Sequence, residues 1–185
     1  MSTNKILNDI NLSAKPYVIY KTSNGFDLFT DFSKKIILSN NNVTNFLETI
    51  SSNKKKIKKT DLYIGFFGYE LLNHLIGIKF PKQKTNFFPK GIFYKPETLI
   101  SLSENLSFKA LTTDKKNKQF KININRKNYT KIFNKFKRKI KQGETYQIKI
   151  CTKYKNKSKI DPLDFFCRLS KSNLAPEAFM IKDKN

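Results

Sequence analysis

The clearest hydrophobic pattern of the chain lies between residues 126 and 142. Apolar side chains recur there at the three- and four-residue spacing of one helix face: Tyr129, Ile132, Phe133, Phe136 and Ile140. Asn125 stands where an N-cap residue is favoured, and Gly143 stands where a left-handed residue commonly ends a helix. The pattern predicts an amphipathic helix over 126–142.

A two-residue alternation follows this helix. Within 145–152, Tyr146, Ile148 and Ile150 fall on one side, so Gln147 and Lys149 point the other way. The alternation predicts a strand over 145–152.

The end of the chain predicts one more helix and a strand. Asp161 is a suitable cap and Pro162 a suitable first residue for a helix. An apolar run over 175–181 then predicts a strand. Because a strand needs neighbours to satisfy its backbone groups, we expect partner strands outside these 185 residues.

Shorter patterns describe the first 125 residues. Strands are predicted over 16–20, 26–38, 62–70, 98–103, 107–112 and 120–125, helices over 43–50 and 71–78, a turn at 23–25, a charged connector over 51–60 and an irregular connection over 79–96. The two glycines of 62–70 indicate a bend or a close backbone approach. The predicted organisation is a flexible lead-in (1–15), an N-terminal region (16–125) and a final region (126–185).

The formal charge of +23 has two interpretations. A dense basic face attracts nucleic acid or anionic membranes. However, the excess is almost all Lys, with Arg only at 126, 138 and 168, and Asn, Ile, Phe and Tyr are also abundant, which is the signature of A/T-rich codons. Phosphate readers favour the planar fork of Arg. We therefore interpret the lysines as a solvated surface and expect neither a nucleic-acid nor a membrane partner.

Few residues offer chemistry on their own. Cys151 and Cys167 with a single histidine, His74, form no disulfide or zinc framework, so we predict no metal ligands in this chain. His74 is interpreted as packed or at the surface. No secretory run and no stretch of ~20 apolar residues is present, so we expect a cytoplasmic protein.

Three motifs in one order resemble the chorismate-binding enzymes. After the predicted helix comes Gly143-Glu144-Thr145-Tyr146-Gln147, then Asp161-Pro162-Leu163 through Arg168-Leu169, then Asn173-Leu174-Ala175-Pro176. Weaker likenesses are Ile64 to Glu70, similar to the family's "G-Y-x-G-Y-D/E", and Pro16-Tyr17 with Ser23, similar to its opening motif. The likeness runs from about Lys15 to the end and is to component I of aminodeoxychorismate and anthranilate synthases.

This resemblance implies an α/β fold: the N-terminal portion of the component I fold, a two-sheet β-sandwich with outer helices, truncated. Such enzymes use chorismate with Mg²⁺ and take ammonia from a glutaminase subunit. The family's magnesium carboxylates and acid–base groups lie in a C-terminal half that this sequence does not match. We therefore expect the 185 residues alone to have no turnover.

Gln147 separates two branches of the family. Relatives that activate water, the isochorismate and salicylate synthases, carry Lys at this position as the base, whereas glutamine cannot take up a proton. Gln147 therefore favours the ammonia-using branch and is a candidate for the active-site wall. The alternative is a half-exposed strand glutamine without a role.

The choice of product rests on the segment before the last strand. By resemblance, Ser23, Pro176, Glu177 and Ala178 occupy the family's tryptophan-type pocket. A carboxylate at 177 would be costly to desolvate against an indole. We therefore favour aminodeoxychorismate synthase, which serves folate biosynthesis, over anthranilate synthase, which serves tryptophan biosynthesis.

Two further alternatives stay open. One is a basic nucleic-acid-binding module using 131–141 and 149–159, which would need exposed aromatics among the lysines. The helix aromatics lie on the face away from the lysines, where we expect a core. The other alternative is a degenerate paralogue that keeps the fold and only binds a partner.

Overall fold

The computed structural model describes residues 3–52, 61–77, 88–102, 106, 120–157, 160–173 and 175–183. Contacts divide the chain into two compact units: unit 1 comprises 1–109 with 162–185, and unit 2 comprises 110–161. The regions predicted from the sequence, with boundaries at residues 15 and 125, are consecutive segments of the chain, and this division stays a prediction.

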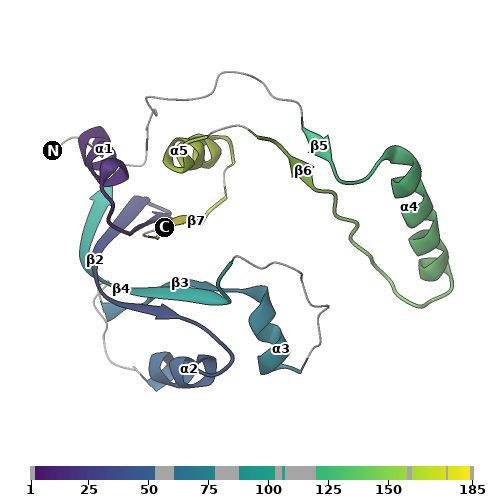
Figure 1. Cartoon of the computed structure of the whole chain (residues 1–185), viewed down its shortest axis with the longest axis horizontal. Coiled ribbons are helices and arrows are strands. Elements are labelled where there is room, and N and C mark those ends of the chain that lie inside the picture. The colour runs from purple at the N-terminus through teal and green to yellow at the C-terminus, as the bar shows by residue number, and fades with distance from the viewer. Residues whose placement is uncertain are drawn as a thin grey trace. The chain divides into compact units, whose positions relative to one another are not determined.

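Unit 1 is built on a five-stranded antiparallel sheet in the order β3-β4-β2-β1-β7 (Figure 1). Its strands are β1 (Tyr17–Thr22), β2 (Gly25–Ile37), β3 (Ile64–Phe67), β4 (Gly91–Leu102) and β7 (Ala178–Lys182). The mixed α/β class is confirmed, whereas the expected two-sheet sandwich stays a prediction. The predicted turn at 23–25 joins β1 to β2, and Gly25 has a φ of 130°, a conformation that favours glycine.

Helices α1 (Thr3–Leu12) and α5 (Pro162–Ser172) contribute to the largest core. Its buried members are Leu7, Tyr17, Ile19, Phe26, Leu28, Leu102, Leu106, Leu163, Phe166 and Cys167. The α5 helix begins at the predicted Pro162. Helix α1 lies within the expected lead-in and was not predicted, although Ile6, Leu7 and Ile10 have helical spacing and pack in this core.

A second core holds α2 (Val43–Ser52), the helix predicted over 43–50, against the sheet. Val43 is fully buried and the Phe46 ring lies 4.8 Å from that of Phe93. A 3₁₀ turn (Tyr69–Leu71) and the short α3 (Leu72–Leu75) follow β3. A third cluster lies among the strands themselves and includes Val18, Phe29, Ile92 and Tyr94.

Strand β4 corrects the prediction of an irregular connection up to Pro96. The prolines indicated loop, but β4 begins at Gly91 and runs through Pro96. On one side of β4, pairing with β3 ends at Tyr94. On the other side, Pro96 pairs with Phe32 of β2, and the register of this ladder shifts between Phe32 and Lys34. A proline without an N–H is tolerated at such an irregular position. The part of the predicted connection at 79–87 lies outside the described residues.

The glycine of β3 confirms the predicted close approach. A Cβ added to Gly65 would lie 1.9 Å from the carbonyl oxygen of Ile92 on the neighbouring strand. Since no side chain fits that distance, β3 can pair with β4 only because residue 65 is glycine.

The final strand corrects a second expectation. Strand β7 pairs antiparallel with β1 from Tyr17↔Lys182 to Lys21↔Ala178. One partner strand thus lies within the chain, although we expected the partners outside it. Among the described residues, the other edge of β7 pairs with no strand.

Unit 2 contains α4 (Arg126–Lys141) and a ladder of two short strands, β5 (Lys121–Ile122) and β6 (Tyr154–Lys155). The side chain of Asn125 accepts a hydrogen bond from the Asn128 N–H at 2.9 Å, and Gly143 has a φ of 75°. The predicted helix and both of its ends are confirmed.

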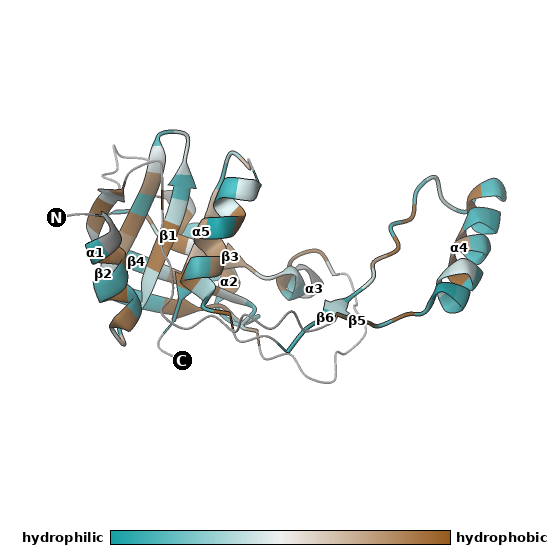
Figure 2. Cartoon of the chain, turned by 90° about the horizontal axis from the view of Figure 1, so that it is seen from above, coloured by the Kyte–Doolittle hydropathy of each residue, from teal (hydrophilic) through white to brown (hydrophobic). Residues whose placement is uncertain are grey.

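The apolar face of α4 is not the expected core. No residue of α4 is buried; Ile132 is 36% and Phe133 46% exposed. Figure 2 shows apolar positions on this helix among hydrophilic ones. The strand predicted over 145–152 is also wrong, because these residues join no ladder. The segment 120–125 contributes only β5, and 98–102 is the end of β4. Residue 103 and the segment 107–112 lie outside the described residues.

Candidate functional site

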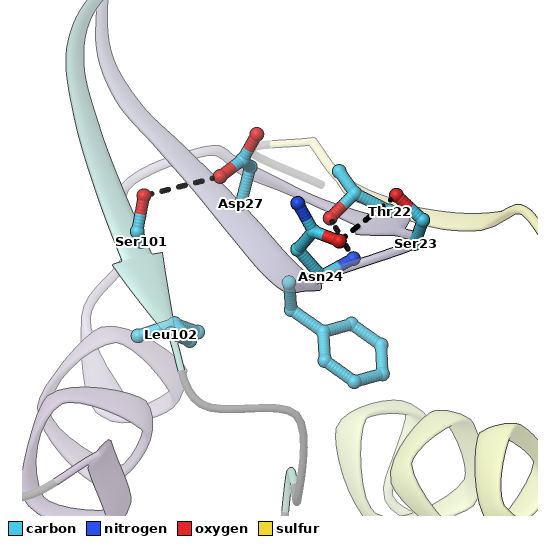
Figure 3. Close-up of a pocket in the computed structure, with 7 residues that line it drawn as sticks. Thr22, Ser23, Asn24, Asp27, Ser101 and Leu102 are labelled. Atoms are coloured by element: carbon cyan, nitrogen blue, oxygen red, sulfur yellow. Dashed lines mark hydrogen bonds between the residues drawn. The ribbon is translucent and has the colours of Figure 1, made fainter.

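The β1–β2 turn and the end of β4 line a pocket of about 440 Å³ (Figure 3). Its lining residues are Thr22, Ser23, Asn24, Phe26, Asp27, Ser101 and Leu102. The Thr22 hydroxyl accepts from the Asn24 N–H at 3.3 Å and donates to the Gly25 carbonyl at 3.2 Å. Ser23 donates to the Asn24 side chain at 3.2 Å. These local bonds fix the polar rim of the pocket.

A buried carboxylate forms one wall. Asp27 is only 6% exposed and accepts a hydrogen bond from the Ser101 hydroxyl at 3.3 Å. The ladders explain this position, because Asp27 pairs with Ser101 on β4 and with Tyr20 on β1. A carboxylate there can accept hydrogen bonds from a ligand's hydroxyl or N–H groups. Sequence reasoning missed Asp27; its signal was an acidic residue within the apolar run of 26–29.

Three of the four residues of the predicted tryptophan-type pocket lie outside this lining. Lys21↔Ala178 is the last pair of the β1–β7 ladder, and Ser23 and Pro176 each lie two residues beyond it. The ammonium of Lys21 donates to the Ala175 carbonyl at 2.9 Å, which ties the segment before β7 to β1. The structure thus brings Ser23, Pro176 and Ala178 to the same end of the sheet, while only Ser23 lines the cavity.

Glu177, the fourth predicted residue, is exposed and interacts with Tyr20. Burial of the phenol raises the pKa of Tyr20, and a hydrogen bond and the negative charge of Glu177 raise it further. The carboxylate at 177 is therefore directed at β1.

Gln147 lies in unit 2 and is exposed. Its backbone carbonyl accepts a hydrogen bond from the Thr145 hydroxyl at 3.2 Å. Because 145–152 form no strand, the predicted orientation of Gln147 on a sheet face is wrong. Its role as an active-site wall stays a prediction based on resemblance.

Residues 13–185 match the sequence model of a family described as chorismate binding enzyme. The chain belongs to the chorismate-binding enzyme family. A search among curated proteins found no match. The matched range includes the β1–β2 pocket, α4, Gln147 and β7. Family membership confirms the resemblance and implies chorismate as the substrate.

Mg²⁺, the cofactor implied for chorismate-binding enzymes, would need several oxygen ligands in one place. The part of the chain described by the structure contains no cluster of three or more His, Cys, Asp or Glu side chains that could hold a metal. Its two buried acids are separate: Asp27 bonds Ser101, and Asp164 pairs with Arg168 at 2.9 Å. The described residues therefore do not fit a magnesium site.

The remaining candidates, one histidine and two cysteines, do not line the β1–β2 pocket. His74 is exposed on α3, Cys151 is exposed, and Cys167 is buried in the α5 core. None of the described helices is long and apolar enough to cross a membrane.

Proposed function

We propose that this member of the chorismate-binding family belongs to the amination branch and acts as component I of an aminodeoxychorismate synthase. The observation that carries the proposal is Gln147. A water-activating enzyme needs a proton acceptor there, and an amide cannot accept a proton near neutral pH. Ammonia needs no such base because it attacks as a neutral amine.

The proposed reaction replaces the 4-hydroxyl of chorismate by an amino group. A C–N bond forms to ammonia, the C–O bond breaks, and water leaves with the hydroxyl oxygen. Gln147 offers an amide that can donate and accept hydrogen bonds beside the substrate without generating hydroxide. A glutaminase subunit is the proposed source of ammonia.

Glu177 supports 4-amino-4-deoxychorismate rather than anthranilate as the product. Its carboxylate interacts with Tyr20 at the end of the sheet where the tryptophan-type residues gather. An indole packed there would have to desolvate a carboxylate. Feedback by tryptophan, the end product of the anthranilate route, is therefore disfavoured. Anthranilate synthase component I is the second candidate because, by resemblance, Ser23 and Pro176 occupy positions of the tryptophan-type pocket.

The net charge favours an anionic substrate. Chorismate carries two carboxylates, and a chain of formal charge +23 raises the local concentration of anions. Binding of chorismate should therefore weaken as ionic strength rises.

Genetic complementation tests the proposal. The gene, carried with its own downstream sequence, is introduced into one strain that requires p-aminobenzoate because it lacks aminodeoxychorismate synthase component I. It is also introduced into a strain that requires tryptophan because it lacks anthranilate synthase component I. We expect rescue of the first strain only.

A second arm expresses the 185 residues alone and should rescue neither strain, since the acid–base and metal groups of the family are not matched here. Rescue of the tryptophan strain alone would make anthranilate the product. Accumulation of isochorismate or salicylate would refute the amination branch.

A further inference from the structure

Helix α4 has an apolar face that the proposed function does not use. Its five apolar side chains, which we call the apolar stripe, are Tyr129, Ile132, Phe133, Phe136 and Ile140. None of them is buried: Tyr129 is 37% exposed and Phe133 46%, and their two rings stack with centroids 6.5 Å apart. Apolar side chains that are exposed together on one face indicate an interaction surface.

The rest of α4 is strongly basic. Its sixteen residues include eight Lys or Arg and no acid, and Glu144, the first acid after the helix, pairs with Lys139. Lys137 follows Phe133 by four residues and Lys139 follows Ile132 by seven, so these lysines flank the apolar stripe on opposite sides. Their aliphatic stems can lie along an apolar layer while the ammonium groups reach a polar, anionic one.

The width of the apolar stripe favours a flat partner surface. The stripe covers only about a third of the helix circumference, and a flat apolar layer would cover it while the polar side stays in water. A groove in another protein would also enclose the flanking lysines and desolvate their charges. A nucleic acid offers phosphates but no apolar layer for Ile132 and Ile140. A second copy of the helix would bring the same eight positive charges and repel the first.

We propose that α4 binds the surface of an anionic membrane and lies parallel to it, with the apolar stripe at the boundary of headgroups and acyl chains. Helices with one apolar face, low overall hydropathy and a polar face rich in Lys and Arg bind membranes in this way. The lysines beside the stripe contact the anionic headgroups. Such binding takes place at the surface and needs no membrane-spanning helix.

The proposal changes two expectations drawn from the sequence. The apolar pattern of α4 predicted a core, and the lysines were interpreted as solvated, without a membrane partner. The exposure of the stripe removes the core and leaves an apolar face between cations. Membrane binding would also stabilise α4, which is marginal in water when its cap and one ion pair hold it.

Co-sedimentation of the whole chain with lipid vesicles tests the proposal. One set of vesicles is an equimolar mixture of phosphatidylcholine and phosphatidylglycerol, and the control set is phosphatidylcholine alone. We expect binding to the anionic vesicles to be stronger by roughly a hundredfold, since each cation near the surface contributes about fivefold and at least three lie there. Binding should weaken strongly between about 0.1 M and 1 M salt, because the screening length falls from about 10 Å to about 3 Å.

Two variants separate the apolar stripe from the charge of the helix. Phe133→Glu and Asn134→Glu each add one negative charge at an exposed position of α4, but Asn134 lies on the side away from the stripe. Asn134→Glu should weaken binding to anionic vesicles roughly fivefold, the effect of one charge. Phe133→Glu should weaken it roughly fiftyfold or more, because the apolar contact is lost as well. Equal losses would overturn the proposal.

A tryptophan reporter distinguishes insertion from simple adsorption. The chain contains no tryptophan, so Phe136→Trp supplies the whole indole signal. We expect its emission to shift to shorter wavelength with anionic vesicles and to be quenched by lipids brominated in their acyl chains. Asn134→Trp, on the side of α4 away from the stripe, is the matched control and should show neither change.

Three further results would contradict membrane binding. One is a short-wavelength emission of Phe136→Trp before vesicles are added, which would mean that protein already covers the stripe. The others are equal binding to both kinds of vesicle and no binding to anionic vesicles at about 0.1 M salt. Because no residue of α4 is buried, the substitutions disturb no core, and circular dichroism of each variant verifies that the helix content is kept.

Discussion

The two units use similar hydrophobic patterns with opposite results. In unit 1, Leu28 on β2 and Leu163 on α5 are fully buried in one core. In unit 2, α4 has a clean apolar stripe, and none of its residues is buried. Periodicity therefore predicts which side chains share a face, but it does not predict whether anything covers that face. Cover depends on contacts between segments far apart in the sequence.

The difference also determines what holds each unit together. Unit 1 is stabilised by apolar area removed from water, which rewards tight packing. Helix α4 relies on local terms, its Asn125 cap and the ion pair of Lys139 with Glu144 beyond its end. A helix of sixteen residues held only by such terms is marginal in water.

Truncation of a core leucine should give the largest contrast. Leu28→Ala should cost about 2–5 kcal/mol of the free energy of unfolding, since it leaves a cavity in the main core. Ile132→Ala on α4, where the side chain is 36% exposed, should cost less than about 1 kcal/mol. Urea unfolding of both variants measures the difference. Equal losses would mean that the apolar face of α4 is buried in solution.

A substitution in the sheet should come next. Gly65→Ala should cost about 1–3 kcal/mol or more, because its Cβ meets the backbone of Ile92 and the strands must separate. Gly143→Ala, with no atom within 4 Å of the added Cβ, should cost only the strain of its φ of 75°, about 1 kcal/mol. Thermal unfolding followed by circular dichroism compares them. A neutral Gly65→Ala would contradict the pairing of β3 with β4.

The helix cap offers a test confined to unit 2. Asn125→Ala should lower the stability of α4 by about 1 kcal/mol, because the Asn128 N–H loses its acceptor. Hydrogen exchange should quicken in α4 and stay unchanged in unit 1. Asn134→Ala, at an exposed position within the same helix, is the control and should slow exchange or leave it unchanged. Faster exchange throughout the chain would show that the two units unfold together.

The smallest expected effect appears only at alkaline pH. Burial raises the pKa of Tyr94, and the negative charge of Asp183 raises it further. The folded chain therefore keeps this proton after the unfolded chain has lost it, so the contribution of Tyr94 to stability is constant below a pH of about 10 and falls above it. Tyr94→Phe should reduce that fall in urea unfolding, while the raised pKa of Tyr20 leaves a remainder. An unchanged pH profile for Tyr94→Phe would contradict the burial of this phenol.

Local features were predictable from the sequence. The α4 helix, its Asn125 cap, the turn before Gly25 and the close approach at Gly65 all follow from a few neighbouring residues. The alternation over 145–152 gave a wrong prediction because a two-residue period is necessary for a half-buried strand but does not provide a strand to pair with. Strand β7 pairs with β1, which lies near the other end of the chain, and no local pattern predicts this pairing.

The candidate site divides in the same way. Ser23 was reached by resemblance and does line the pocket, but the Asp27–Ser101 bond depends on the β2–β4 register. Register between strands so far apart is fixed by tertiary packing, and the sequence between Asp27 and Ser101 gives no period that predicts it. Family membership was predicted from the order of the motifs, which does not depend on a correct prediction of each helix and strand.

Product analysis with isotopically labelled ammonia tests the central claim most directly. The protein, expressed from the gene with its own downstream sequence, is incubated with chorismate, Mg²⁺ and ¹⁵N-ammonium. The reaction products are then separated, and their masses are measured by mass spectrometry. We expect 4-amino-4-deoxychorismate carrying one ¹⁵N, because Gln147 leaves ammonia as the nucleophile. Isochorismate or salicylate without ¹⁵N would contradict the assignment of this chain to the amination branch.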